Sequence, residues 1–179
     1  FRAGKAWFGH LPGGAAVSTI AACGGFAAIN GSSVATAATM TTVALPEMRK
    51  QGYEPGLAAG TIAVGGTLGI MIPPSGAMLI YGILTEQDVG QLFAAGILPG
   101  LLGMLMYVAV IALIARRAPH LLPQGERSSW PERFASLRGI WATFVLFGLV
   151  VLALYGGFVT VTEAASVGCL GAFLIGVMR

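Results

Sequence analysis

The sequence NGSS occupies residues 30–33 and the sequence GGTLGIMIPPS occupies residues 65–75, each inside a long apolar run. Glycine, proline and small polar residues at these points oppose a continuous α-helix. In a lipid bilayer every backbone N–H and C=O needs a partner, so broken helices persist only where they are buried in protein or line a polar cavity. Two such breaks close in sequence predict an ion or solute site near the middle of a membrane.

The composition places both breaks in a membrane protein. The 179 residues are 56% hydrophobic and 9% charged, with a mean hydropathy of +0.82. Soluble domains carry about 25% charged residues, so we expect a polytopic membrane protein. The chain opens without methionine and ends inside an apolar run, and we therefore expect it to be an internal fragment of a longer protein.

The apolar runs divide the chain into membrane segments. Residues 13–46 hold two halves of about 14–17 residues, each about 21–26 Å long as helix, whereas the apolar core of a bilayer is about 30 Å thick. A re-entrant hairpin therefore fits these residues better than two complete spans. Two complete spans remain an alternative, because they would leave the following segments on the same sides of the membrane. The other expected segments are a cytoplasmic flank at 1–12, a cytoplasmic loop at 47–55, a broken transmembrane helix at 56–84, transmembrane helices at 92–114, 140–156 and 162–178, and a cytoplasmic amphipathic connector at 115–139.

The distribution of positive charge agrees with this layout. With these segments, the connections around residues 85–88 and 155–160, which contain no Lys or Arg, share one side of the membrane. All ten basic residues fall on the other side, which the positive-inside rule assigns to the cytoplasm. They are Arg2, Lys5, Arg49, Lys50, Arg116, Arg117, Arg127, Arg133, Arg138 and Arg179.

The first break has the chemistry of an ion site. One half-helix is expected to end near Ile29 and the next to begin near Ser33, so exposed carbonyls that favour a cation meet free N–H groups that favour an anion. Neutral oxygens that suit Na⁺ are added by Asn30, Ser32, Ser33 and Thr36. The alternative is a tight turn with an N-capping serine, but the membrane setting favours the ion site.

The second break has the same character. Pro73-Pro74 removes two backbone donors and clashes with the preceding turn, while Gly65, Gly66 and Gly69 weaken the helix before it. These features predict an unwound, ligand-facing stretch over residues 65–75 rather than a packing kink.

Catalytic chemistry is not indicated. Glu163 is the one carboxylate within the last two apolar runs, and the order Thr160-Val161-Thr162-Glu163 predicts a capping box rather than a proton relay. The sequence contains no recognisable nucleophile–base pair, phosphate-binding loop or Cys/His cluster, and we therefore expect no enzyme.

These segments closely resemble the large membrane subunit of tripartite ATP-independent periplasmic (TRAP) transporters, over almost the whole chain and in order. The resemblance is carried by residues 11–14, 30–39, 44–53, 65–75, 92–96, 99–100, 155–158 and 162–165. Two departures are Asn30, where the family more often has serine, and Val161, where it often has proline.

The resemblance implies part of an all-α, inverted-repeat, elevator-type ion-transporter fold in the inner membrane of a bacterium. It implies Na⁺ as the coupling ion and import of an organic anion such as a C4-dicarboxylate or sialic acid. The implied partners are a periplasmic substrate-binding protein and a small membrane subunit, with lipid around them and no nucleic acid.

The resemblance also assigns site residues by matching motif. The implied Na⁺ site consists of Asn30, Ser32, Ser33, Thr67 and Gly69. The residues implied to lie beside the substrate are Ser33, Thr36, Pro73, Pro74 and Ser75. Two other readings stay open: a divalent-anion:Na⁺ symporter that needs no binding protein, and a membrane scaffold subunit that transports nothing.

Overall fold

The computed structural model describes residues 2–125, 129–138 and 141–177, and every regular element in these ranges is a helix. The expected all-α fold class is therefore confirmed. Arg127 and Arg179 lie outside the described residues. In chain order the elements are α1 (Arg2–Phe8), α2 (Gly14–Asn30), α3 (Ser33–Val43), α4 (Leu45–Lys50), α5 (Pro55–Met71), α6 (Gly76–Leu84), α7 (Val89–Arg117), the 3-10 turn η1 (Pro119–Leu121), α8 (Trp130–Arg138), α9 (Trp141–Tyr155) and α10 (Val161–Val177).

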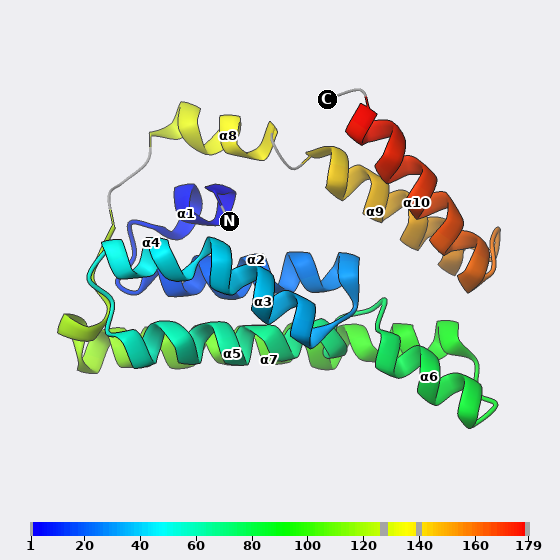
Figure 1. Ribbon diagram of the computed structural model, residues 1–179, viewed down its shortest axis with the longest axis horizontal. Helices are drawn as coiled ribbons and strands as arrows, with labels where there is room; N and C mark the ends of the chain where they lie inside the picture. The colour runs from blue at the N-terminus through cyan, green and yellow to red at the C-terminus, as the bar shows by residue number, and fades with distance from the viewer. Residues whose placement is uncertain (1, 126–128, 139–140, 178–179) are drawn as a thin grey trace.

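The first break turns the chain back on itself. Helix α2 has 17 residues and α3 has 11, and the two run in opposite directions on either side of the turn at residues 31–32 (Figure 1). At 1.5 Å per residue, each arm is shorter than the apolar core of a bilayer, about 30 Å. The predicted hairpin thus has two helical arms, and helix α4 follows it directly.

Helix α5 packs against both arms of the hairpin, and three glycines allow the close approach. A Cβ atom on Gly65 would lie 2.6 Å from the sulfur of Cys23 on α2, and one on Gly66 would lie 2.9 Å from the Cβ of Ala37 on α3. Gly69 meets the backbone of Ser32 in the same way.

The prediction that the chain is unwound from residue 65 is therefore wrong. Residues 65–71 are helical, and the break is confined to residues 72–75. Each glycine weakens a helix by about 1 kcal/mol relative to alanine, but here the glycines bring α5 into contact with two neighbours, and that packing offsets the cost.

Within the part of the chain that the structure describes, two apolar stretches are long enough to cross a membrane by length and composition. They are Pro55–Leu84, which contains the second break, and Val89–Arg117. Only 28% and 11% of their most apolar windows are buried within the chain. An apolar surface of this length that stays exposed is suited to lipid or to a membrane partner rather than to water.

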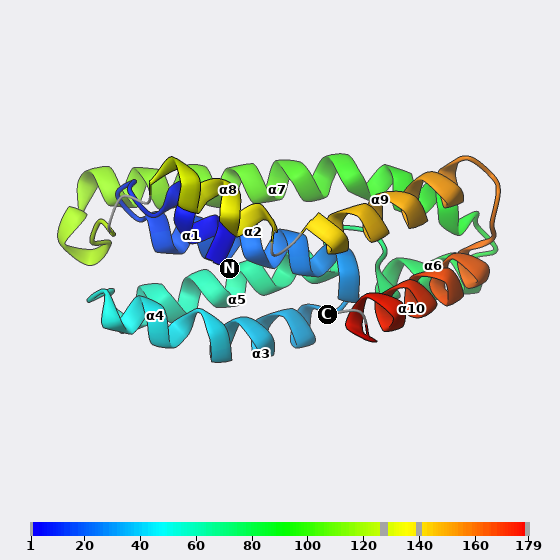
Figure 2. The same ribbon diagram turned by 90° about the horizontal axis from the view of Figure 1, so that it is seen from above.

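Helices α2, α3, α5 and α7 lie side by side along the long axis (Figure 2), and one end of this bundle is held together by several contacts. Lys5 forms an ion pair with Glu47, and the Tyr53 hydroxyl accepts a hydrogen bond of 3.1 Å from the amide of Ala15. Backbone hydrogen bonds at this end also join residue 54 to residue 121 and residue 125 to residue 9. This end carries the basic residues at the ends of α4 and α7.

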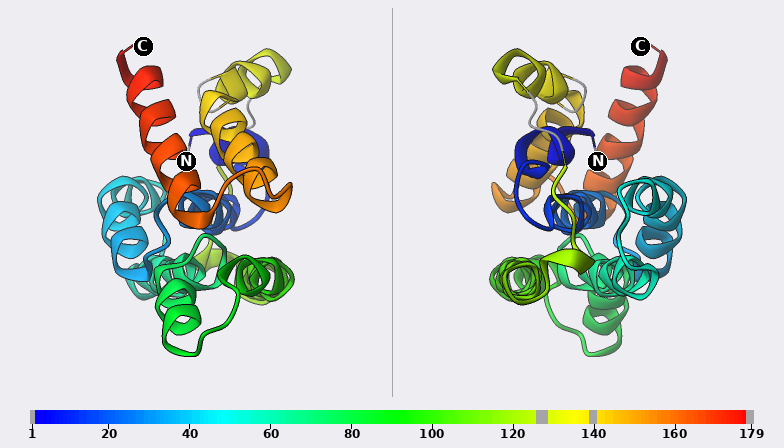
Figure 3. Two further views of the ribbon diagram at one scale, coloured as in Figure 1. Left: turned by 90° about the vertical axis from the view of Figure 1, so that its right-hand side faces the viewer. Right: turned by 90° about the vertical axis from the view of Figure 1, so that its left-hand side faces the viewer.

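The last two helices form a pair of their own. Helices α9 and α10 pack against each other, with the side chain of Leu146 against Gly171, and they project away from the bundle in Figure 3. Helix α8 precedes them and packs on α1, where the rings of Trp7 and Phe134 meet edge to face at 6.2 Å.

Candidate functional site

The hairpin turn begins where α2 ends. Asn30 is the last residue of α2, and Gly31 follows with a φ of +62°, in the left-handed region that glycine adopts without steric cost. The amide of Gly31 donates to the carbonyl of Ala27 at 3.0 Å. Ser32 then caps α3, because its hydroxyl accepts a hydrogen bond of 3.3 Å from the amide of Ala35. The turn thus sets the carbonyl end of one short helix beside the N–H end of the next.

The side chain of Asn30 closes this turn. Its Oδ1 accepts a hydrogen bond of 2.7 Å from the amide of Ser32, and its Nδ2 lies 3.2 Å from the hydroxyl of Thr36. The Thr36 side chain is fully buried, and its hydroxyl donates to the carbonyl of Ser32 at 2.8 Å. Three predicted site residues therefore form one hydrogen-bonded unit.

The second break joins α5 to α6. Ile72 is extended, with φ −87° and ψ 122°, as expected for a residue before proline. Pro73-Pro74 has no N–H to continue the helix. Ser75 is 1% exposed, and its hydroxyl donates to the carbonyl of Ile70 at 2.8 Å and accepts from the amide of Met78 at 3.4 Å. One hydroxyl thus connects the end of α5 to the start of α6.

The two breaks are in direct contact. The amide of Gly76, the first residue of α6, donates to the carbonyl of Gly31 at 3.2 Å. A Cβ atom on Gly31 would lie 2.4 Å from the carbonyl oxygen of Pro74. The backbone of one break therefore lies against the backbone of the other with no room for a side chain between them.

Gly69 completes the junction from the side of α5. A Cβ atom on this residue would lie 2.5 Å from the carbonyl oxygen of Ser32 and 2.8 Å from the amide nitrogen of Ser33. Helix α5 therefore touches the hairpin turn through backbone atoms at the start of α3.

Most of the predicted site residues meet at this junction. They are Asn30, Ser32, Ser33, Thr36, Gly69, Pro73, Pro74 and Ser75. The hydroxyl of Thr67 is directed elsewhere, because it donates to the carbonyl of Val64 at 2.6 Å and lies 2.9 Å from the hydroxyl of Tyr107 on α7. Residues 67 and 69 differ by about 200° around the helix. The structure does not bring the Thr67 side chain to the hairpin turn.

Sequence reasoning missed the contact between the two breaks and the partner of Thr67. Gly31 and Gly76 contribute backbone groups, and only the fold shows that these two glycines meet. Tyr107 carries an isolated hydroxyl within an apolar run. A lone hydroxyl at this depth in a membrane indicates a polar contact, and this was the signal in the sequence.

Helix ends supply the electrostatics of the junction. Residues 30–36 and 69–76 include no Asp, Glu, Lys, Arg or His. The carbonyl ends of α2 and α5 carry partial negative charge, and the N–H ends of α3 and α6 carry partial positive charge. Within the described residues no group of three or more His, Cys, Asp or Glu could hold a metal ion. Carbonyl and hydroxyl oxygens are instead the donors that coordinate alkali cations in broken-helix transporters.

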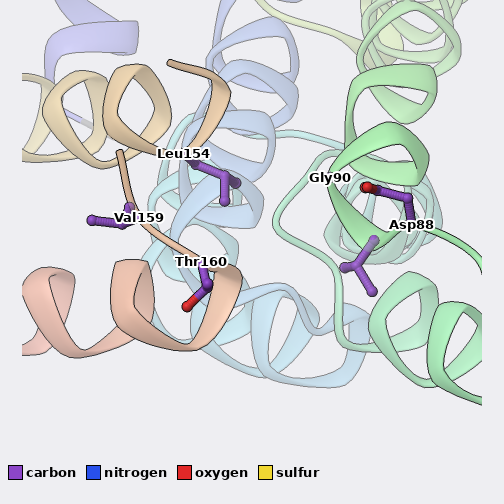
Figure 4. A pocket seen from close by; sticks show the side chains of 6 residues that line it. Asp88, Gly90, Leu154, Val159 and Thr160 are labelled. Carbon is purple, nitrogen blue, oxygen red and sulfur yellow. The ribbon is translucent and has the colours of Figure 1, made fainter. Parts of the chain in front are cut away.

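A separate open hollow of about 380 Å³ lies at the opposite end of the bundle from the Lys5–Glu47 pair, between the start of α7 and the α9–α10 connection (Figure 4). Its polar lining comes from Asp88 and Thr160. Asp88 caps α7 by accepting a hydrogen bond of 2.9 Å from the amide of Gln91. The hollow therefore lies between two capped helix ends.

The predicted capping box at the start of α10 is confirmed. A carboxylate oxygen of Glu163 accepts hydrogen bonds of 2.8 Å from both the amide and the hydroxyl of Thr160. The amide of Glu163 donates back to that hydroxyl at 3.4 Å. Glu163 thus has a local structural partner at the helix end.

Comparison with known proteins gives a consistent answer. Residues 1–179 match the family described as "Tripartite ATP-independent periplasmic transporter, DctM component". The chain is 42% identical over 163 residues to the C4-dicarboxylate TRAP transporter large permease protein DctM of Pseudomonas aeruginosa, covering 91% of this chain and 38% of that protein. It is 37% identical to the ectoine TRAP transporter large permease protein TeaC of Halomonas elongata, covering 95% of this chain and 39% of the relative. It is 29% identical to the sialic acid TRAP transporter large permease protein SiaM of Vibrio cholerae, covering 98% of this chain and 41% of the relative. The chain thus spans about two fifths of the length of these relatives.

Proposed function

Because the chain belongs to the family of the DctM component of TRAP transporters, we propose that it forms part of a Na⁺-coupled permease that imports an organic anion. The family consists of transporters and not of enzymes, in agreement with the sequence-based expectation. The observation that carries the proposal is the junction at Gly31 and Gly76, where helix ends of both polarities meet beside buried hydroxyls.

The cation is proposed to bind on the carbonyl side of the junction. The last helical hydrogen bond of α2 runs from Gly31 to Ala27, so the carbonyls of residues 28–30 lie beyond it. Among the described residues the hydroxyl of Ser33 has no hydrogen-bond partner. Neutral oxygens of these two kinds, with Gly69 packed behind them, fit Na⁺ better than a transition metal.

The anion is proposed to bind on the N–H side of the junction. The junction contains no Lys or Arg that could neutralise a carboxylate. Helix N-termini bind anions through free N–H groups and the helix dipole, and α3 and α6 both begin here, after Ser32 and Ser75. Residues 73–75 and Thr36 would border this space, and the bound anion would then lie next to the cation that accompanies it.

Charge arithmetic supports coupling to sodium. Moving one charge across 100 mV is worth about 2.3 kcal/mol, so import of a dianion into a negative interior costs about 4.6 kcal/mol. Two Na⁺ ions would cancel this cost, and a third would make uptake electrically driven. Sodium coupling therefore offsets the electrical cost of dianion import.

The moving unit is proposed to be the hairpin together with α5. Gly65, Gly66 and Gly69 bring the two into backbone-close contact, and such an interface does not slide without clashes. These elements would move as one rigid body, as an elevator mechanism requires. In the intact transporter of a bacterial inner membrane, a periplasmic binding protein would deliver the substrate and a small membrane subunit would brace the permease.

A reconstitution experiment tests the proposal. The full-length permease is placed in proteoliposomes with its small subunit, and uptake of labelled C4-dicarboxylate, sialic acid and ectoine is measured with the companion binding protein. We expect uptake of a carboxylate that requires both an inward Na⁺ gradient and the binding protein. Uptake that ignores the gradient would refute sodium coupling, and uptake without the binding protein would favour an independent symporter. Absence of uptake for every offered anion would favour a scaffold role.

A further inference from the structure

The amide of Asn30 has partners on both sides. Its Oδ1 accepts the amide proton of Ser32 at 2.7 Å and also lies 3.3 Å from the hydroxyl of Thr36. Thr36 has a single hydroxyl proton, and the shorter contact of 2.8 Å directs it to the carbonyl of Ser32. The Nδ2 of Asn30 therefore donates to the Thr36 oxygen at 3.2 Å. This closed set of hydrogen bonds, formed by Asn30, Ser32 and Thr36, is called the turn latch below.

The turn latch leaves little scope for Asn30 to bind an ion directly. Both polar atoms of its amide lie within 3.3 Å of the Thr36 oxygen, and the Thr36 side chain is 0% exposed. The amide thus faces the interior of its own turn. We propose that Asn30 is a positioning residue of the transport site, which acts through Ser32 and Thr36 and is not itself a ligand of the cation. This inference rests on the proposed function.

The latch positions groups on both sides of the turn. It fixes the residue before Gly31, whose left-handed conformation sends its carbonyl to the amide of Gly76. It also fixes the amide of Ser32, and with it the start of α3 at Ser33. The carbonyl end of α2 and the Ser33 hydroxyl thereby keep a defined separation, which an ion site needs because misplaced ligands lose affinity.

The length and chemistry of asparagine suit this role. Serine at position 30 would have a shorter side chain with one polar atom, so a single oxygen would have to accept from Ser32 and donate to Thr36, whereas asparagine uses two separate atoms. Aspartate would keep the acceptor for Ser32 but lose the donor for Thr36. Asparagine supplies both groups at one position.

A double-mutant cycle separates positioning from direct binding. In the reconstituted full-length transporter, the half-saturating Na⁺ concentration is measured for Asn30→Ala, Thr36→Val, the double variant and the control Thr41→Val. The control is matched, because the hydroxyl of Thr41 also donates to the carbonyl four residues earlier, at 2.8 Å, but belongs to the exposed part of α3. We expect each latch variant to raise the half-saturating concentration about tenfold, the double variant to be no worse than either, and the control to match the parent.

Direct binding predicts a different pattern. If Asn30 were a ligand, Asn30→Ala would weaken Na⁺ binding while Thr36→Val behaved like Thr41→Val. Additive losses in the double variant would likewise overturn the proposal, because two residues that act as one unit cannot lose independent contributions.

Hydrogen exchange of the Ser32 amide gives a readout that does not depend on sodium. We expect this amide to be protected in the parent protein, to exchange about tenfold faster in Asn30→Ala, and to regain protection in Asn30→Asp, which restores an acceptor. Unchanged exchange in Asn30→Ala would refute the latch even if uptake were sodium-dependent. Uptake independent of Na⁺ would refute the proposed ion coupling, while exchange of the Ser32 amide would still decide whether the latch exists.

Discussion

The amide of Gly76 donates a hydrogen bond of 3.2 Å to the carbonyl of Gly31, and this bond joins the two helix breaks of the chain. The glycines belong to different helical segments, and neither has a side chain that could carry the contact. The junction is therefore made by the backbone, and its requirements are steric: short side chains, a left-handed turn and close approach of helix ends.

Gly31→Ala is expected to disrupt the junction. A φ of +62° is unfavourable for alanine by about 1–2 kcal/mol, and the added Cβ would lie 2.4 Å from the carbonyl oxygen of Pro74. We expect a loss of at least about 2 kcal/mol in the free energy of unfolding, measured by denaturation of the full-length protein in detergent. Gly25→Ala is the control, because a Cβ at Gly25 meets nothing within 4 Å. Equal stability of the two variants would contradict the described turn.

Gly69→Ala is expected to push α5 away from the hairpin. The new Cβ would lie 2.5 Å from the carbonyl oxygen of Ser32, and backbone cannot move aside as a flexible side chain can. Uptake by the reconstituted transporter should fall at least about tenfold, since displacement of ligands by about 1 Å is enough for such a loss. Gly60→Ala on the same helix meets nothing within 4 Å and should retain uptake.

Ser75→Ala should weaken the connection between α5 and α6. The lost hydroxyl donates to the carbonyl of Ile70 and caps the amide of Met78, and it is 1% exposed, so water cannot replace it. The expected cost is about 1–2 kcal/mol, as for other N-cap serines. Faster hydrogen exchange of the Met78 amide, with unchanged exchange in α2, would identify the effect as local, and protection equal to that of the parent would count against it.

Thr67→Val and Tyr107→Phe distinguish an ion ligand from a contact between helices. The Thr67 hydroxyl lies 2.9 Å from that of Tyr107, so either substitution removes the same hydrogen bond between α5 and α7. If this contact is the whole role of Thr67, both variants lose similar stability, under about 1.5 kcal/mol, and keep the parent's half-saturating Na⁺ concentration. A large rise in that concentration for Thr67→Val alone would instead support the predicted role of Thr67 in the sodium site.

The ion pair between Lys5 and Glu47 predicts a pH dependence. The hydrogen bond from Lys5, aided by one from Gln51, holds the pKa of Glu47 below its ordinary value of 4.5. A lowered pKa in the folded state adds stability above pH 4.5, and this stability is lost as the pH falls through the folded pKa. The pair is partly exposed, so the contribution should stay under about 1 kcal/mol.

Thermal denaturation between pH 7 and pH 3 checks this dependence. The parent should lose more stability on acidification than Glu47→Gln, and Lys5→Met should resemble Glu47→Gln. Parallel curves for the parent and both variants would show that the pair contributes nothing.

The break at Asn30 could be predicted from sequence because its signals are local. A polar turn sequence with glycine inside an apolar run requires the helix to end, and Ser32 follows as an N-cap. The capping box of Thr160 and Glu163 was predictable for the same reason. In each case the interacting residues lie within a few positions of one another.

The predictions for α5 failed or stayed incomplete where the structure depends on contacts between residues far apart in sequence. The glycines at 65, 66 and 69 resemble an unwound stretch by propensity, but contacts with Cys23, Ala37 and Ser32 keep them helical. The orientation of Thr67 depends on Tyr107, which is far away in sequence. Helix propensity gives the free-energy cost of placing these residues in a helix, whereas tertiary packing decides whether the folded protein offsets that cost.

The contact between Gly31 and Pro74 also has a consequence for the exchange of segments among relatives. Residues 30–36 and 69–76 should be exchanged together, because the two stretches pack backbone against backbone. A chimera that takes both stretches from one parent should retain the fold at this point. A chimera that divides them between parents must preserve glycine at positions 31 and 69, where an added Cβ would lie within 2.5 Å of the carbonyl oxygen of Pro74 or Ser32.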